Sequence, residues 1–102
     1  MYRRLTAEQA AEKMRLAKKY ILLDVRTPQE YRAGHVRGAV PVRGGLIATL
    51  APEILPDRDA LILLYCNAGG RSGRAAAVLP SLGYKSVYYF GLSGWTYGLE
   101  DG

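Results

Sequence analysis

Apolar residues along the chain fall into four short continuous runs, separated by segments in which they recur at helical spacing. The runs contain aliphatic, β-branched and aromatic residues and predict strands at residues 20–25, 40–42, 60–65 and 87–90. The run at 60–65 is the strongest of them. Because Pro41 lacks the N–H that a central strand donates, we expect the 40–42 strand to lie at an edge of the sheet.

Two helices carry clear start signals. Thr6 and Gln9 form a capping-box pattern, after which apolar residues recur on one face over residues 7–17. A second, short helix is expected to begin at Pro28. Thr27 precedes it as a favourable N-cap, and proline fits the first helical position because no N–H is needed there.

The other helical segments lie on either side of the strongest strand. Before it, apolar residues at 46–50 predict one or two turns, which we expect Pro52 and Pro56 to interrupt. After it, helical spacing continues until Gly83, which fits the left-handed position that closes a helix. Pro80 lies inside this last segment. Since proline costs about 3 kcal/mol in a helix interior, we expect the helix to kink or end there.

Strands that alternate with helices indicate an α/β fold, in which a mostly parallel sheet carries helices on both faces. A chain of 102 residues is expected to form one domain, residues 1–102, because domains commonly run to about 100 to 200 residues. No repeat, low-complexity segment or linker interrupts the pattern. We therefore expect one modest hydrophobic core.

Composition excludes several classes of protein. The chain has 14 Lys and Arg against 9 Asp and Glu, a net charge of +5, but its cations are dispersed, so we expect no nucleic-acid binding. Cys66 is the only cysteine and His35 the only histidine, which excludes a disulfide framework and a structural zinc site. No apolar run approaches the roughly 20 residues of a membrane helix, and the N-terminus lacks a signal-peptide pattern. We expect a cytoplasmic protein.

The single thiol stands where the strongest strand meets a helix. Gly69 and Gly70 follow Cys66 and allow backbone dihedrals that turn successive N–H groups inward, as in an anion-binding nest. The next helix adds about half a positive charge at its N-terminus, and Arg71 adds a full one. A thiol pKa near 8.5 falls to about 3.5–7.5 in such surroundings. We therefore expect Cys66 to be a reactive thiolate rather than a buried structural cysteine.

Three segments resemble the rhodanese-like sulfurtransferase family. The first comprises residues 23–31, 34–36 and 38–42 and is similar to the family's N-terminal motif. The second, residues 66–72, resembles its active loop: cysteine, two variable residues, glycine, one variable residue, arginine and serine. The third, Gly91 to Trp95, is a weaker match to a C-terminal glycine and tryptophan motif. The first two motifs occur in the family's order.

The resemblance implies a five-stranded parallel sheet and sulfur transfer through a persulfide on Cys66, with no metal and no cofactor. It implies a small anionic sulfur donor, such as thiosulfate or polysulfide, and a thiol, cyanide or sulfur-carrier acceptor. Members specialised for thiosulfate often carry a basic residue near the position of Glu30, so the carboxylate here argues against efficient use of thiosulfate. The chain is expected to be a monomer or a weak homodimer.

The resemblance also assigns site residues. Cys66 is the nucleophile, and the substrate-binding loop is formed by Asn67, Ala68, Gly69, Gly70, Arg71 and Ser72. An internal polar network supporting the site comprises Asp24, Arg26, Glu30 and His35. Within it we expect Arg26 to pair with Asp24 or Glu30, and His35 to hold a turn. Arg43 and Arg74 are expected to border the pocket and attract an anion.

Two alternatives belong to other functional classes. Phosphatases with a related loop have five residues between cysteine and arginine, whereas only four separate Cys66 from Arg71. The shorter loop makes a tighter cradle, which suits a sulfur atom better than a phosphoryl group. The other alternative is a rhodanese-like binding or regulatory module of a larger protein. The presence of both Cys66 and Arg71 argues against an inactive module.

Overall fold

A computed structural model describes residues 1–102 and contains one sheet of five strands. The strands are β1 (Tyr2–Arg4), β2 (Ile21–Asp24), β3 (Val40–Pro41), β4 (Leu61–Cys66) and β5 (Ser86–Gly91). Their spatial order is β1-β5-β4-β2-β3, and all neighbouring strands run parallel. The parallel α/β fold predicted from the alternation of elements is confirmed.

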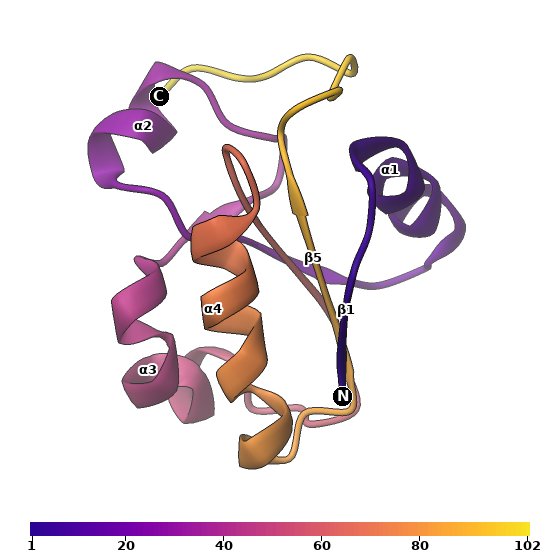
Figure 1. The fold of residues 1–102 in the computed structure, drawn as a ribbon, viewed down its shortest axis with the longest axis vertical. Helices are drawn as coiled ribbons and strands as arrows, with labels where there is room; N and C mark the ends of the chain where they lie inside the picture. The colour runs from indigo at the N-terminus through magenta and orange to yellow at the C-terminus, as the bar shows by residue number, and fades with distance from the viewer.

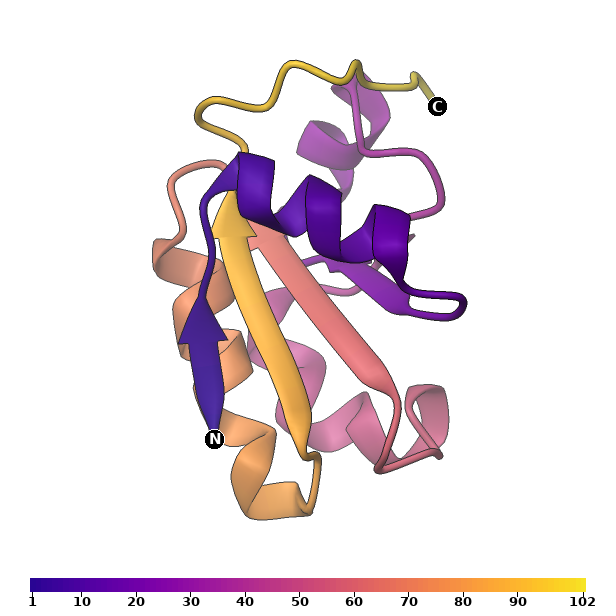
Figure 2. The ribbon, with the colours of Figure 1, turned by 90° about the vertical axis from the view of Figure 1, so that its right-hand side faces the viewer.

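Helices cover both faces of this sheet (Figures 1 and 2). The helices are α1 (Ala7–Leu16), α2 (Pro28–Ala33), α3 (Ile47–Ile54) and α4 (Gly70–Val78), with 3₁₀ turns at Gly44–Leu46 and Pro80–Leu82. On one face α3 and α4 pack against the strands, and on the other α1 buries Ala10 and Met14 against Phe90 of β5. The short α2 lies near the carboxyl ends of the strands (Figure 1). None of the helices has the length and apolar character needed to cross a membrane.

Local start and stop signals in the sequence predicted several boundaries correctly. The expected capping box at Thr6 forms, and Thr27 is the N-cap of its helix as expected, where a capping box with Glu30 is also present. Helix α4 ends at Val78, just before Pro80, as expected. A 3₁₀ turn follows, and Gly83 closes that turn at φ +96°. β3, which contains Pro41, is an edge strand as expected.

Pro52 does not interrupt its helix, contrary to expectation. Helix α3 continues through it to Ile54, and Ile47 and Ala51 on its buried face, like Leu55 at the C-cap, have no exposed surface. Burial of two large aliphatic side chains contributes about 3 to 6 kcal/mol, enough to offset the cost of proline in a helix. The Tyr84 hydroxyl also lies within hydrogen-bond distance of the carbonyl oxygens of Ala51 and Leu55, at 2.9 and 2.5 Å.

β1 was absent from the strands predicted by hydrophobic pattern. Its three residues, Tyr2 to Arg4, are all exposed, so they show no apolar run or alternation. Pairing with β5 holds them in the sheet, with Arg4 opposite Tyr89. This strand completes the five-stranded sheet that the family resemblance implied.

Candidate active site

Cys66 is the last residue of β4, a central strand, and lies at the carboxyl edge of the parallel sheet. Ligands of open α/β sheets bind at this edge, where a strand leads through a loop into a helix. The loop here is short, because α4 begins at Gly70. The expectation that Cys66 would not be a buried cysteine is wrong on this point: only 1% of its surface is exposed, because as the last residue of β4 it belongs to the same core cluster as Ala75 of α4.

Backbone N–H groups of the loop point at the sulfur of Cys66, as the nest interpretation predicted. Gly69 donates its N–H to Sγ at 3.0 Å, and Ser72 donates its N–H at 3.3 Å. The Ser72 hydroxyl oxygen lies 3.4 Å from the same sulfur. Gly69 adopts φ +102°, a left-handed conformation that favours glycine and allows the chain to curl around the sulfur.

These contacts determine the direction in which the pKa of Cys66 shifts. Burial alone acts to raise the pKa, because it penalises the charged thiolate. The hydrogen bond shared with the Ser72 hydroxyl and those donated by backbone N–H groups of the loop oppose burial and outweigh it. The pKa of Cys66 therefore lies below its ordinary value, and the arrangement favours the nucleophilic thiolate.

Arg71 is held by Glu30 rather than standing free in the loop. The guanidinium donates two hydrogen bonds to the carboxylate, Nη1 to Oε1 at 2.6 Å and Nη2 to Oε2 at 3.0 Å. The pair lowers the pKa of Glu30 to about 2, mainly through the Arg71 hydrogen bonds. Glu30 raises the pKa of Arg71, and the nearby charge of Cys66 acts in the same direction. Arg71 is thus paired directly with a carboxylate, while its interaction with Cys66 is electrostatic.

Asn67 ties the loop to α2 and to the end of β2. Its side-chain nitrogen donates to Glu30 at 2.8 Å, and its side-chain oxygen accepts from Arg26 at 3.2 Å. Ala68 contributes its carbonyl oxygen, which accepts a hydrogen bond from Arg4 at 3.0 Å. The loop is therefore fixed from outside by side chains of three other segments.

Asp24 and Arg26 form a buried ion pair next to the loop. Arg26 binds both carboxylate oxygens of Asp24, with Nη2 2.7 Å from Oδ2, and donates a further hydrogen bond to the Gly34 carbonyl at 2.6 Å. The Tyr65 hydroxyl donates to Asp24 at 2.7 Å. Of the two partners expected for Arg26, the structure shows Asp24, while Glu30 pairs with Arg71.

His35 lies in a different set of contacts. Its Nδ1 is 3.0 Å from the carbonyl oxygen of Tyr31, and the two rings stack with centroids 3.8 Å apart. Its backbone forms an isolated antiparallel bridge with Glu100. These contacts hold the turn after α2, as expected, and place no hydrogen bond between His35 and the sulfur.

Gly91 at the end of β5 allows the loop to approach closely. A Cβ at this position would lie 2.9 Å from the backbone of both Asn67 and Ala68. Leu92, the next residue, donates its N–H to the Cys66 carbonyl at 3.0 Å. Gly91 is part of the weakest of the three segments of resemblance, and the structure gives a steric reason for glycine there.

Replacing Gly91 with alanine is expected to lower the free energy of unfolding by about 1 to 3 kcal/mol, because backbone atoms of the loop must move away from the new methyl group. Urea denaturation measures the change. Gly45→Ala is the matched control, since a Cβ there meets no atom within 4 Å. Equal stability of the two variants would contradict the steric interpretation.

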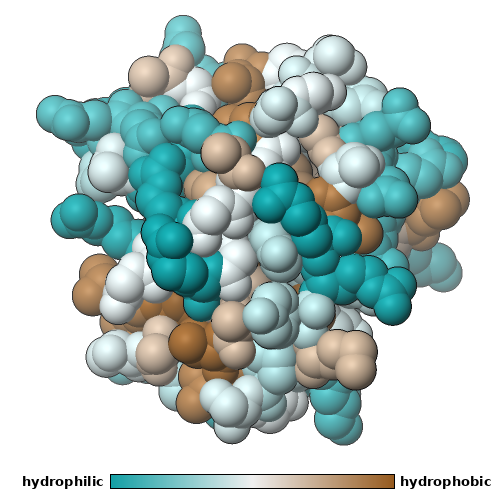
Figure 3. Space-filling view, viewed as in Figure 1, coloured by the Kyte–Doolittle hydropathy of each residue, from teal (hydrophilic) through white to brown (hydrophobic).

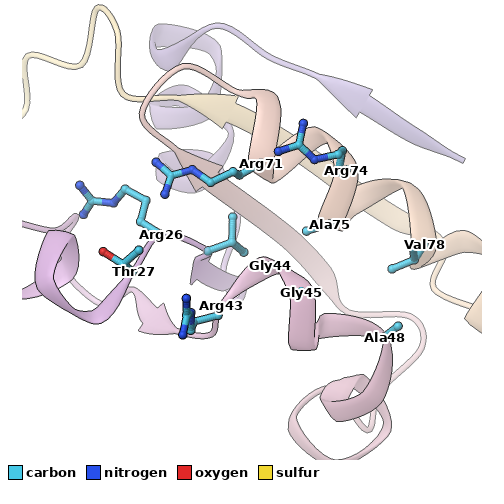
Figure 4. A pocket seen from close by; sticks show the side chains of 11 residues that line it. Arg26, Thr27, Arg43, Gly44, Gly45, Ala48, Arg71, Arg74, Ala75 and Val78 are labelled. Carbon is cyan, nitrogen blue, oxygen red and sulfur yellow. The ribbon is translucent and has the colours of Figure 1, made fainter.

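A pocket of about 450 Å³ lies beside the loop, between α4 and the segment that follows β3 (Figure 4). Arg71 and Arg74 project from one side and Arg43 from the other, and Val25, Ala75 and Val78 supply apolar lining. Arg43 and Arg74 border the pocket as expected, and neither has an ion-pair partner. Figure 3 shows the same face of the molecule, where strongly hydrophilic side chains flank a paler strip. The pocket is suited to an anion.

Comparisons with known proteins agree with this arrangement. The profile of the rhodanese-like domain matches residues 6–97. Thiosulfate sulfurtransferase PspE of Escherichia coli is 35% identical over 65 residues, which are 64% of this chain and 62% of PspE, so the match spans less than two thirds of that relative. Thiosulfate sulfurtransferase GlpE of Pseudomonas entomophila is 34% identical over 87 residues, covering 85% of this chain and 76% of GlpE.

A solved structure shows the same fold. A rhodanese with anions from E. coli superimposes with a TM-score of 0.76 at 30% identity, covering 82% of this chain and all of that one. The chain belongs to the rhodanese-like domain family, among whose members are the thiosulfate sulfurtransferases it resembles.

Proposed function

We propose that the protein is a sulfurtransferase in which Cys66 accepts a sulfane sulfur from an anionic donor and passes it to a thiol acceptor. The observation that carries this proposal is the pair of backbone N–H groups, from Gly69 and Ser72, that face the sulfur at 3.0 and 3.3 Å. They favour a thiolate and later stabilise negative charge on a bound sulfur. The names of the relatives support the same class of reaction.

The reaction consists of two displacements at sulfur. With thiosulfate as the model donor, the Cys66 thiolate attacks its outer sulfur, a new S–S bond forms, and the old S–S bond breaks with its electron pair on sulfite. A thiolate acceptor then attacks the outer sulfur of the Cys66 persulfide. The acceptor leaves as a persulfide and Cys66 returns as a thiolate, which gives ping-pong kinetics. Neither step requires a metal or a redox cofactor to balance.

Access to the sulfur requires local movement. Cys66 is buried and is not among the side chains that line the neighbouring pocket. Arg71 lines the pocket and also interacts electrostatically with Cys66. We propose that the donor enters beside Arg71 and that its negative charge competes with Glu30 for the guanidinium. The substrate-binding roles of residues 67–72, and the supporting roles of Asp24, Arg26 and Glu30, are part of this proposal.

Intact-mass spectrometry tests the proposed chemistry. Protein incubated with thiosulfate or with polysulfide is expected to gain about 32 Da, the mass of one sulfur atom, through persulfidation of its only thiol. Addition of a small thiol or cyanide should remove the added mass. A phosphatase would instead hydrolyse p-nitrophenyl phosphate and gain no sulfur, and that combination of results would replace the proposal with phosphate-ester hydrolysis.

The pocket arginines make a second prediction. Replacing both Arg43 and Arg74 with alanine is expected to raise the KM for thiosulfate about three- to tenfold with little change in kcat, because the two exposed cations attract the anion but do not touch the reacting sulfur. Steady-state kinetics at low ionic strength measures the effect. Lys85→Ala, which removes an exposed cation paired with Asp59, is the control. An unchanged KM would exclude these arginines from donor binding.

A further inference from the structure

Arg4 lies beside the active loop although it is distant from it in sequence. It is the last residue of β1, opposite Tyr89 of β5 in the parallel pair, and the backbone N–H of Leu5 also bonds to the Tyr89 carbonyl at 2.8 Å. The guanidinium carbon is 5.7 Å from the centroid of the Tyr89 ring, a cation–π arrangement. From there its Nη2 donates to the carbonyl oxygen of Ala68 at 3.0 Å.

That carbonyl belongs to the same peptide unit as the N–H of Gly69. The unit is planar, and the chain has no cis peptide bonds, so the C=O of Ala68 and the N–H of Gly69 point in opposite directions. The oxygen faces Arg4, and the N–H faces the sulfur of Cys66 at 3.0 Å. We propose that Arg4 is a positioning residue of the active site, which fixes this peptide so that its N–H is directed at Cys66.

Two physical effects follow from the contact. Rotation of the peptide would turn the Gly69 N–H away from the sulfur, and rotation also breaks the Arg4 hydrogen bond, so Arg4 stabilises the productive orientation. A cation bound to the carbonyl polarises the peptide as well, which strengthens the N–H as a donor. Arg4 therefore acts on the thiolate through one peptide unit without touching it.

The conformation and identity of Gly69 are consistent with this role. Its φ of +102° already favours glycine, and a Cβ there would lie 2.7 Å from the guanidinium carbon of Arg4. Arg4 thus packs against the position that a side chain of residue 69 would occupy. The guanidinium covers the outside of the peptide, while the sulfur lies on its inside.

Other charged groups surround the loop but make their contacts elsewhere than at the Ala68 carbonyl. From α4, Arg71 interacts with Cys66, and from α2, Glu30 pairs with Arg71. Arg26, bound to Asp24, reaches the loop through Asn67. None of these groups bonds to the carbonyl of Ala68, whose only side-chain hydrogen-bond donor is Arg4. The effect of Arg4 can therefore be separated from theirs by substitution.

The test measures the reactivity of Cys66 directly. Because the chain has one cysteine, the pH dependence of iodoacetamide alkylation, followed by intact mass, reports the pKa of that thiol alone. Arg4→Met retains side-chain length but removes the charge and the donor. We expect the apparent pKa to rise by about 0.5 to 1 unit, which lowers alkylation about three- to tenfold below the wild-type pKa. Arg4→Lys should restore part of the difference.

The control is Arg3→Ala, since Arg3 is the neighbouring residue of β1 and makes no hydrogen bond to the loop. It should leave the alkylation profile unchanged. A profile of Arg4→Met identical to wild type, with or without a lower Tm, would overturn the proposal and reduce Arg4 to a contact that holds β1. If Arg4→Met does not fold, Arg4→Gln takes its place, since it also removes the charge: a raised apparent pKa supports the proposal, and one within about 0.2 units of wild type overturns it.

The catalytic importance of this positioning rests on the proposed function, but the alkylation profile does not. A shifted profile together with no sulfur adduct on the wild-type protein would retain Arg4 as a positioning residue and reject sulfur transfer. An unshifted profile together with a normal sulfur adduct would reject the positioning role of Arg4 and retain sulfur transfer. The two failures are therefore distinguishable.

Discussion

Replacing Cys66 with serine is expected to lower sulfur transfer by on the order of a thousandfold or more, because a hydroxyl is far less ionised at neutral pH and is a poor nucleophile without an adjacent base. No other side chain of the chain carries a thiol. His35, the only histidine, is bonded to the Tyr31 carbonyl and contributes no hydrogen bond at Cys66. Serine at position 66 would therefore lack the base that activates it in hydrolases.

The measurement for Cys66→Ser is turnover with thiosulfate and cyanide, combined with intact mass after exposure to the donor. The variant should bind the anion in the arginine-lined pocket but gain no sulfur. Circular dichroism and Tm serve as controls for folding, since serine differs from cysteine by one atom. Turnover within tenfold of wild type would show that sulfur does not pass through residue 66.

Replacing Asp24 with alanine is expected to lower the free energy of unfolding by about 3 to 5 kcal/mol, a large share of the stability of a small domain. Asp24 has no exposed surface and accepts hydrogen bonds from Arg26 and from the Tyr65 hydroxyl. Without the carboxylate, the guanidinium of Arg26 remains buried and loses its only counter-charge. The Tyr65 hydroxyl loses its acceptor at the same time.

Urea denaturation of Asp24→Ala measures this loss, and Glu12→Ala is the matched control. Glu12 also pairs with an arginine, Arg15, at 2.6 Å, but both side chains are more than half exposed. Exposed pairs contribute about 0 to 1 kcal/mol, so we expect a small effect. Similar losses of unfolding free energy in the two variants would show that burial does not determine how much Asp24 contributes to stability.

The sequence predicted the elements whose local signals agree with their tertiary environment. Leu61–Cys66 is an apolar run because both faces of this central strand are covered by helices. β1 could not be found in this way. Its residues are exposed, and what makes them a strand is pairing with β5, a segment about 85 residues later, which leaves no periodic signal in the local sequence.

The candidate site also contains some features that local sequence predicts and others that depend on contacts between distant residues. The glycine-rich loop that follows β4 predicted N–H groups aimed at the sulfur of Cys66. This prediction was possible because the conformation of such a short loop depends on residues adjacent in sequence. The pairing of Arg71 with Glu30 could not be assigned, since the two are 41 residues apart and Arg26 was an equally reasonable partner for Glu30. Arg4 gave no signal, because its contact with Ala68 depends on the position of an edge strand.

The donors that face the sulfur belong largely to the main chain, which separates activation of the nucleophile from recognition of its partners. Ala68 accepts the Arg4 hydrogen bond through its outward-facing carbonyl, and the residue is exposed to solvent. If the proposed acceptor approaches the loop from this side, substitution of the Ala68 methyl group changes the surface it meets and leaves every N–H that faces the sulfur in place. Under the proposed function, we expect a substitution at this exposed position to change the preference for the acceptor and to leave the reactivity of the thiolate unchanged.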